Sequence, residues 1–391
     1  MKIETKIMKI AFLTPEYPHP KTGSSGGIGT SIKNLAIGLL AQGCSVRVLV
    51  YGQNKESVFD DNGITIQQIQ NVKLKGLSWF LTRKKIERII NQLYASKEID
   101  LVEAPDWTGI TSFIQPKKCP IVIRLNGSDT YFCHLDNRPV KWRNKFHERR
   151  ALQMADGLLS VSQFTADLTN QVFGLQKEFT IIPNSIDMDL FDGDSNVNSN
   201  DKNTILYFGS LIRKKGLLEL PFIFNEVIQK NPEVQLLLIG KDVPDVLSGN
   251  PSTWEMMQEL FTAAALQNVS YLGSVPYQEI KAHIKAAGVC VFPTFAEALP
   301  VSWIEAMALQ KPIVASNIGW AKEVIEEGVE GFLVHPKAHK KYAVRILELL
   351  ESPKLQSTFG IAARKKVTLA FSTEKVARQS MLFYQRLVKN Q

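Results

Sequence analysis

Short apolar runs rich in β-branched residues alternate with longer amphipathic segments along almost the entire chain. In the first half the runs are KIAFL, VRVLVY, IDLVE, PIVIRL, GLLSVS and FTIIP. The stretches between them are long enough for the crossover helices that parallel strands require. The alternation restarts later with TILYFGS, VQLLLIG, VSYLG, VCVFP, PIVAS and GFLVH. The pattern predicts an α/β protein with two doubly wound parallel sheets.

A polar break separates the two series of strands. Residues 191–203, FDGDSNVNSNDKN, consist mostly of Asp, Asn, Ser and Gly and cannot bury an apolar surface. We therefore predict a first Rossmann-like domain at 1–190, a linker at 191–203 and a second Rossmann-like domain at 204–372. A chain of 391 residues is long for a single core, which agrees with two domains. Apolar side chains recur at helical spacing in 373–391, and this helix is expected to pack back on the first domain.

The helices expected in the second half lie at 215–230, 252–267, 276–287 and 301–310. Ligands of doubly wound sheets bind outside the carboxyl ends of the strands. Two such domains that face each other form a cleft at those ends, so we expect the chemistry there.

Composition excludes several classes of protein. No apolar run approaches the roughly 18 residues that span a bilayer, and Lys6 and Lys9 interrupt the first apolar stretch, so we predict neither a membrane span nor a signal peptide. The cysteines lie far apart without CxxC spacing, which indicates reduced thiols in a cytoplasmic protein and no structural zinc: Cys44, Cys119, Cys133 and Cys290.

Positive charge is concentrated in the first half. The net charge is +8, and residues 1–190 hold 24 Lys and Arg against 18 Asp and Glu. Within 138–150, RPVKWRNKFHERR, six cations accompany one acid, Glu148. Two interpretations stay open: a solvated helix, or a surface for phosphates or acidic lipid headgroups at the inner face of the cell membrane. Nucleic acid is not expected as a partner, because no recognition motif accompanies the charge.

A glycine-rich loop follows the first predicted strand. Gly26, Gly27 and Gly29 stand at the start of a helix, whose free amides favour anions. The segment is either a phosphate cradle or a surface loop. The dinucleotide fingerprint GxGxxG fails, because Ile32 stands where its third glycine belongs. This argues against an NAD-dependent oxidoreductase.

Two segments of the second half combine charges with strand ends. FGSLIRKKG puts Arg213 and Lys215 between a strand and a helix, where cations meet an anion at the helix N-terminus. In FPTFAEALPVSWIEAMA, Glu297 ends a loop, Pro300 opens a helix and Glu305 lies one turn in. Carboxylates placed in this way can accept hydrogen bonds from the hydroxyls of a sugar or ribose.

Taken together, these motifs resemble the group 1, family 4, retaining glycosyltransferases of GT-B fold. The resemblance rests on Glu297-x7-Glu305 followed by AMA, on FGSLIRKKG, and on three further segments. These are GGIG (26–29), ERRALQMADGLLSVS (148–162) and IIPNSID (181–187). A later segment, GWAKEVIEEGVEGFLVHP with Gly319 and Glu323, is also similar to the family. The motifs cover nearly the whole chain in the family's order.

The resemblance implies a role for each matching residue of the second domain. Lys215 and Arg213 bind the donor diphosphate, although Ser210 stands where many members carry an arginine. Glu305 holds the ribose hydroxyls, and Glu297 lies near the transferred sugar. Amides at the start of the following helix contact the phosphates, at Leu299, Val301 and Ser302.

In the first domain the resemblance implies two further positions. Gly27 lets the backbone approach the diphosphate closely. Asn126 stands where many members carry a histidine near the donor sugar. An Asn side chain can bond a hydroxyl but cannot take a proton. His134, eight residues later, could replace that histidine from the loop, or it is a surface side chain.

The expected activity is retaining transfer of a hexose from a UDP- or GDP-sugar to a saccharide or lipid-linked acceptor, in the synthesis of a cell-surface polysaccharide or glycan. No metal or other cofactor is expected, because cations and helix amides can stabilise the leaving diphosphate. The DxD pattern at Asp187-Met188-Asp189 is interpreted as turn chemistry. Asn126 and Ser210 keep an alternative open, a catalytically silent protein that binds nucleotide sugar or glycan.

Overall fold

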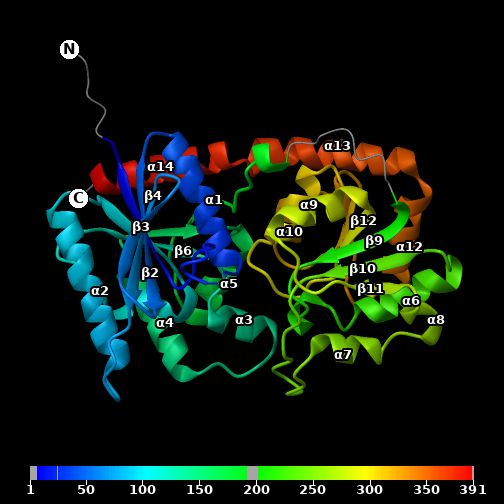
Figure 1. Cartoon of the computed structure of the whole chain (residues 1–391), viewed down its shortest axis with the longest axis horizontal. Coiled ribbons are helices and arrows are strands. Elements are labelled where there is room, and N and C mark those ends of the chain that lie inside the picture. The colour runs from blue at the N-terminus through cyan, green and yellow to red at the C-terminus, as the bar shows by residue number, and fades with distance from the viewer. Residues whose placement is uncertain (1–6, 24, 192–200, 390–391) are drawn as a thin grey trace, which may run out of the picture. The chain divides into compact units, whose positions relative to one another are not determined.

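Two β-sheets, one in each half of the chain, organise the computed structural model (Figure 1). The structure describes residues 7–23, 25–191 and 201–389. These residues belong to two units, Met1–Ile186 with Phe371–Gln391, and Asp187–Ala370. Most of the predicted linker 191–203 lies outside the described residues, and the first strand of the second unit begins at Asp201.

The first unit contains an eight-stranded sheet in which every neighbouring pair is parallel except β3 with β4. In sheet order its strands are β3 (Ser57–Asp61), β4 (Ile64–Gln70), β2 (Ser45–Gln53), β1 (Lys9–Thr14), β5 (Leu101–Pro105), β6 (Ile121–Leu125), β7 (Gly157–Ser160) and β8 (Thr180–Ile181). Its helices are α1 (Gly27–Ala41), α2 (Ser78–Ala95), the 3₁₀ segment η1 (Trp107–Phe113), α3 (Asp129–Leu135), α4 (Trp142–Met154), α5 (Gln163–Phe173) and α14 (Thr373–Lys389).

Both faces of this sheet are buried, as a doubly wound fold requires. Successive side chains of β1 point to opposite faces, so Ile10 and Phe12 join the core beneath α1 and α14. Ala11 and Leu13 join the opposite core, with residues of α2, η1 and α4. The apolar runs of the sequence are therefore continuous because their strands have no solvent face.

One hairpin was absent from the sequence prediction. Strands β3 and β4 pair in antiparallel fashion around Asn62 and Gly63, whose φ angles are 53° and 89°. Asn-Gly between alternating residues is a strong signal for such a turn, since both positions need positive φ. The dipeptide could have revealed this departure from the all-parallel prediction.

Helix α14 packs along α1 in the first unit (Figure 1). A side chain at Gly38 would collide with Thr373 and Ala377, so only glycine lets the two helices approach this closely. Val376 and Tyr384 are buried in the same core.

A buried polar cluster also ties α14 to the sheet. The Arg124 guanidinium donates to both carboxylate oxygens of Glu103, at 2.7 and 3.2 Å, and to the Ser380 hydroxyl at 3.1 Å. The Tyr384 hydroxyl donates to the same carboxylate. Burial lowers the pKa of Arg124, but the charges of Glu103 and Tyr384 and the hydrogen bonds to them together raise it more, so the guanidinium keeps its proton.

The second unit contains a six-stranded sheet in which all neighbouring strands are parallel. In sheet order its strands are β11 (Val269–Tyr271), β10 (Gln235–Ile239), β9 (Asp201–Phe208), β12 (Ala287–Phe292), β13 (Ile313–Ala315) and β14 (Gly331–Leu333). Its helical segments are η2 (Asp189–Phe191), η3 (Arg213–Lys215), α6 (Leu220–Lys230), α7 (Thr253–Gln258), α8 (Ala263–Leu266), α9 (Tyr277–Ala286), α10 (Val301–Ala308), α11 (Ala321–Val324), α12 (His339–Glu351) and α13 (Pro353–Ala370).

Two predicted helices of this unit are shorter or broken. The helix expected at 215–230 starts only at Leu220, because Gly216 adopts a left-handed conformation after the η3 turn. The helix expected at 252–267 is two helices, since Thr262 caps a new one by accepting the Ala265 amide. The sequence predicts helical content correctly here but misses these interruptions.

Each sheet reverses its strand order beside its first strand. In the first unit β2 and β5 flank β1, and in the second β10 and β12 flank β9. Loops at such a reversal diverge to opposite faces and leave a crevice at the carboxyl edge. The glycine-rich loop follows β1, and the RKKG segment follows β9, so both motifs lie at a reversal point.

No helix among the described residues is long and apolar enough to cross a membrane. All four cysteines are buried free thiols.

Candidate functional site

The loop after β9 brings Lys215 to the carboxyl edge of the second sheet. Gly209, directly after the strand, has a φ of 137°, and a methyl group there would lie 3.4 Å from the Lys215 ammonium and 3.2 Å from the Tyr207 hydroxyl. Gly216 has a φ of 74°, and a side chain there would collide with the Pro293 carbonyl. Glycine on each side therefore shapes the space that holds the lysine.

The loop after β12 meets this lysine. The amides of Phe295 and Ala296 donate to the Lys214 carbonyl at 2.8 and 3.2 Å. This backbone contact places the Glu297 carboxylate 3.2 Å from the Lys215 ammonium. Strands β9 and β12 are neighbours in the sheet, so two segments more than 80 residues apart meet at the reversal point.

Glu305, on α10, completes a cluster with these two residues. Its side chain is buried and accepts a 2.6 Å hydrogen bond from the Tyr277 hydroxyl. Burial raises the pKa of Glu305, while the Tyr277 hydrogen bond and the positive charge of Lys215 lower it in part. Burial and the neighbouring carboxylate raise the pKa of Tyr277, so its hydroxyl remains a donor.

Helix α10 begins where the sequence predicts. Pro300 occupies its N-cap position, no described side chain caps it and no acidic residue lies in its first turn. Leu299 is buried, whereas Val301 and Ser302 are half-buried. The first amides of α10 are thus oriented for an anion, beside the carboxylate–lysine cluster.

Arg213 has a different partner from Lys215. Its guanidinium forms a two-pronged pair with Asp245, at 2.8 and 2.7 Å, and the side chain is 38% exposed. Asp245 is buried after β10 and also accepts the Ser248 hydroxyl, and these contacts hold the pKa of its carboxyl well below the usual range. The structure therefore ties Arg213 to the loop after β10, and its contact with phosphate stays a prediction.

The first unit carries the other two predicted positions, Gly27 and Asn126. Gly27 is the first residue of α1 and is exposed. Apart from its chain neighbours and its own helix backbone, no atom of the described residues would lie within 4 Å of a methyl group added there. The Glu16 carboxylate accepts the Gly29 amide at 3.0 Å, so a side chain of the protein already bonds one amide of that helix end. His134 is exposed at the end of α3.

Asn126 follows β6 and is half-buried. Its backbone amide donates to Asp106 at 2.9 Å, and its side chain donates to the Arg124 carbonyl at 3.3 Å. Asp106, which follows β5, is buried, and no described group donates to its second carboxylate oxygen. Burial raises the pKa of Asp106 to about 7, against hydrogen bonds from Asn126 and Gly127 that lower it.

Neither histidines nor the DxD pattern form a metal centre in the described residues. Among residues 7–23, 25–191 and 201–389, no group of three or more His, Cys, Asp or Glu side chains is arranged to hold a metal ion. The Asp187 carboxylate accepts the Asp189 amide at 3.1 Å, which is a turn contact. His339 pairs with Glu219 at 2.6 Å.

Of the predicted site residues, the structure brings Lys215, Glu297 and Glu305 together, with the start of α10 beside them. Sequence reasoning missed Tyr277, Asp245 and Asp106, which belong to segments without a motif. Their only local signal is position, because Asp106 directly follows a strand and Tyr277 opens a helix.

Comparison with known families identifies the class of protein to which this fold and this cluster belong. Residues 191–366 match the family described as glycosyl transferases group 1, and residues 25–190 match Glycosyltransferase Family 4. The two matches cover most of the chain and follow each other in order. The protein belongs to the group 1 glycosyltransferases, which confirms the resemblance seen in the sequence.

Relatives of similar length and solved structures agree with this family assignment. Alpha-maltose-1-phosphate synthase of Mycolicibacterium smegmatis is 23% identical over 97% of this chain and 100% of the relative. The human alpha-1,3/1,6-mannosyltransferase ALG2 is 23% identical over 95% of each chain. Sucrose-phosphate synthase of Thermosynechococcus elongatus superposes with a TM-score of 0.79 at 21% identity, over 98% of this chain and 100% of that one. The structure of Anabaena HepE in complex with UDP-glucose superposes with a TM-score of 0.74 at 21% identity, over 97% of this chain and 100% of that one. The predicted GT-B fold is confirmed.

Proposed function

We propose that this glycosyltransferase moves a hexose from a UDP- or GDP-sugar to a saccharide or lipid-linked acceptor, with retention of anomeric configuration. The observation that carries the proposal is the cluster of Lys215, Glu297 and Glu305 beside the start of α10. A cation and the amides at a helix start suit a diphosphate, and carboxylates suit hydroxyls. Some solved relatives contain UDP, UDP-glucose or UDP with glucose, which is consistent with such a donor.

The reaction breaks the bond between the anomeric carbon and the β-phosphate oxygen, and the bonding electrons leave with the nucleoside diphosphate. The acceptor hydroxyl attacks from the same face, and its proton passes to the departing phosphate oxygen. In this proposal Lys215 and the amides around Leu299, Val301 and Ser302 stabilise the charge that develops on the leaving group. Glu305 holds the ribose, and Glu297 orients the sugar.

Arg213 contributes in this scheme from the same loop, once its pairing with Asp245 has fixed the loop. Gly27 and Asn126 act from the first unit, where Asn126 bonds a sugar hydroxyl and carries no proton. The departing phosphate serves as the base, so the reaction needs neither a histidine at that position nor a metal ion.

Incubation with radiolabelled UDP-, GDP- and ADP-sugars tests the proposal. We expect slow hydrolysis of a UDP- or GDP-sugar without acceptor, with the released sugar first appearing in the α configuration if the donor is α-linked. Tight donor binding without any hydrolysis or transfer would instead support a silent nucleotide-sugar-binding protein. Release of the β anomer would refute retention.

We further propose that the protein works in the cytoplasm, in cell-surface polysaccharide or glycan synthesis, in reversible contact with the anionic inner membrane surface. In the structure Arg138 pairs with Asp136, and the buried Glu148 accepts the Thr130 hydroxyl and amide, so this acid does not neutralise the helix surface. Four exposed cations of the segment remain: Lys141, Arg143, Lys145 and Arg149.

Each cation near an anionic bilayer contributes about 1 kcal/mol, so the four together change the partition coefficient by roughly 1000-fold at low salt. Sedimentation with vesicles rich in phosphatidylglycerol compares wild type with a variant that has all four changed to Gln. A matched control changes four exposed lysines of the second unit to Gln: Lys230, Lys322, Lys340 and Lys354. Equal loss of binding in both variants would show that only net charge matters.

A further inference from the structure

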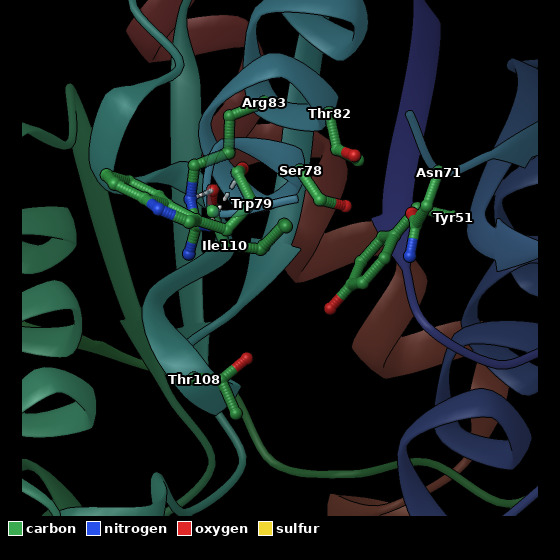
Figure 2. A pocket seen from close by; sticks show the side chains of 9 residues that line it. Tyr51, Asn71, Ser78, Trp79, Thr82, Arg83, Thr108 and Ile110 are labelled. Carbon is green, nitrogen blue, oxygen red and sulfur yellow. Dashed lines mark hydrogen bonds between the residues drawn. The ribbon is translucent and has the colours of Figure 1, made fainter. Parts of the chain in front are cut away.

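The first unit contains a cavity that none of the proposed donor contacts uses. It consists of two adjoining spaces of about 440 and 560 Å³ that share Gly76, Trp79, Arg83 and Thr108. Figure 2 shows Trp79 and Arg83 on one side of the first space, Tyr51 and Asn71 on the opposite side, and Thr108 lower in the view, below Trp79.

The cavity lies at the carboxyl edge of the first sheet. Tyr51 is near the end of β2, Asn71 directly follows β4, and Thr108 follows β5 by three residues. This is the edge at which doubly wound sheets bind ligands. The position alone makes the cavity a candidate for the second substrate of a two-substrate enzyme.

A buried cation forms part of its wall. Arg83, 8% exposed, donates to the carbonyls of Ile110 at 3.1 Å and Trp79 at 3.2 Å (Figure 2). It also donates to the Gly109 carbonyl at 3.4 Å. In the part of the chain that the structure describes, no carboxylate pairs with this guanidinium. The desolvated charge is held by carbonyl dipoles and by the Trp79 ring, whose centre lies 5.5 Å away. Such a charge favours an anion in the adjoining space, and two of its five N–H groups remain for one.

The floor of the cavity is built with backbone strain. Thr108, a β-branched residue, has a φ of 55°, and Gly109 follows with 57°. The Glu148 carboxylate accepts the Thr108 amide at 3.2 Å, and a side chain at Gly109 would collide with the His147 backbone. Strain of this kind persists where the surroundings impose it, and it concentrates at ligand sites.

Other cations reinforce the positive potential. Arg143 lines the second space, and Arg150 lies 4.7 Å from the centre of the Phe113 ring that also lines it. Burial lowers the pKa of His147 to about 4, and the charges of Arg83, Arg143 and Arg150 lower it in the same direction. The imidazole is therefore neutral at physiological pH, and the charge that a ligand meets is that of the arginines.

Exposed apolar side chains surround the mouth. Trp79, Trp142 and Phe146 line the second space and are 45%, 72% and 49% exposed. Leu74 and Leu77, beside the lining residue Gly76, are also exposed. Lysines at 73, 75, 141 and 145 are interleaved with these side chains and are exposed as well. Aromatic and aliphatic groups mixed with cations are typical of surfaces that meet an anionic lipid interface.

We propose that this cavity binds the phosphate-bearing end of a lipid-linked acceptor, with the phosphate beside Arg83 and Arg143 and the lipid chain on the exposed apolar side chains around the mouth. The inference rests on the proposed glycosyltransferase function and specifies its acceptor as an anionic lipid phosphate. The aromatic wall and the polar groups of Tyr51, Asn71 and Thr108 then surround the first sugar.

Calorimetric titration of the full chain with geranyl phosphate tests this site without donor or turnover. We expect geranyl phosphate to bind at least about tenfold more tightly than geraniol or inorganic phosphate, because charge and chain act together. Equal affinity for inorganic phosphate would show a free-anion site, and equal affinity for geraniol would show an apolar pocket only. Either result, or no binding of geranyl phosphate, overturns the proposal.

Three variants make the assignment specific. Arg83→Met and Arg143→Gln should each weaken geranyl phosphate binding at least about tenfold, whereas Arg88→Gln, an exposed arginine of the same helix outside the cavity, should not. Thermal unfolding of each variant is followed in parallel. If Arg83→Met does not fold, the result with Arg143→Gln alone tests the proposal, because Arg143 is exposed. Wild-type affinity in Arg143→Gln refutes the proposal. Absence of donor hydrolysis by the wild-type protein would contradict the proposed function, but it would not change the result of the geranyl phosphate titration.

Discussion

Replacement of Lys215 by alanine is the most direct test of the donor site. The Lys215 side chain is 23% exposed, and its ammonium lies 3.2 Å from the Glu297 carboxylate and lowers the pKa of the buried Glu305. Its removal takes away a charge-assisted contact to the leaving diphosphate, which contributes about 2 to 4 kcal/mol in a closed site. We expect kcat to fall by roughly 30- to 1000-fold. Loss of the partly exposed ion pair itself should cost less than about 1 kcal/mol of folding stability.

The same substitution leaves two carboxylates without their cation. Since Lys215 lowers the pKa of Glu305, that pKa should rise further in Lys215→Ala, and donor KM should then begin to rise at a higher pH on acidification than in wild type. The assay is transfer and donor hydrolysis from pH 5 to 9, with kcat and KM determined separately. Lys230→Ala, at the distal end of α6, is the matched control. A folded Lys215→Ala enzyme with kcat within about threefold of the control would refute leaving-group stabilisation.

Three further outcomes are expected. Glu305→Gln should raise donor KM by roughly tenfold with a smaller change in kcat, because the ribose contact is present in both the ground state and the transition state. Steady-state kinetics measures both constants, and a selective fall in kcat would contradict this prediction. Transfer should persist in EDTA, and a loss that Mn²⁺ or Mg²⁺ restores would return Asp187-Met188-Asp189 to consideration as a metal site. The pKa of Asp106 is about 7 in the folded protein and about 3.9 in the unfolded chain. Ionisation of this carboxyl therefore lowers the free energy of unfolding as pH rises from about 4 to about 7, by roughly 4 kcal/mol in total. Urea unfolding should therefore show Asp106→Asn gaining stability relative to wild type as pH rises across that range, and a constant difference would contradict the assignment.

Local patterns of the sequence predicted a large part of the fold. The apolar runs predicted parallel strands because the central strands of each sheet are buried on both faces. Pro300 predicted the start of α10 because a proline there loses no hydrogen bond. The antiparallel hairpin at Asn62-Gly63 was missed although its signal is equally local. The late start of α6 was missed for another reason, since it depends on the approach of Gly216 to Pro293, a residue far along the chain.

The sequence by itself determined which residue types stand at the ends of β9 and β12, and it thereby predicted Lys215, Glu297 and Glu305. Their identity is visible locally because Lys215 and Glu297 lie in loops that follow strands, and Glu305 lies one turn into a helix. Only the tertiary structure decided that Tyr277 bonds Glu305, that Asp245 holds Arg213, and that Arg83 lines a cavity without a carboxylate partner among the described residues. Those contacts join residues 27 to 32 positions apart, and hydrophobic periodicity carries no information about which side chains meet across such a distance.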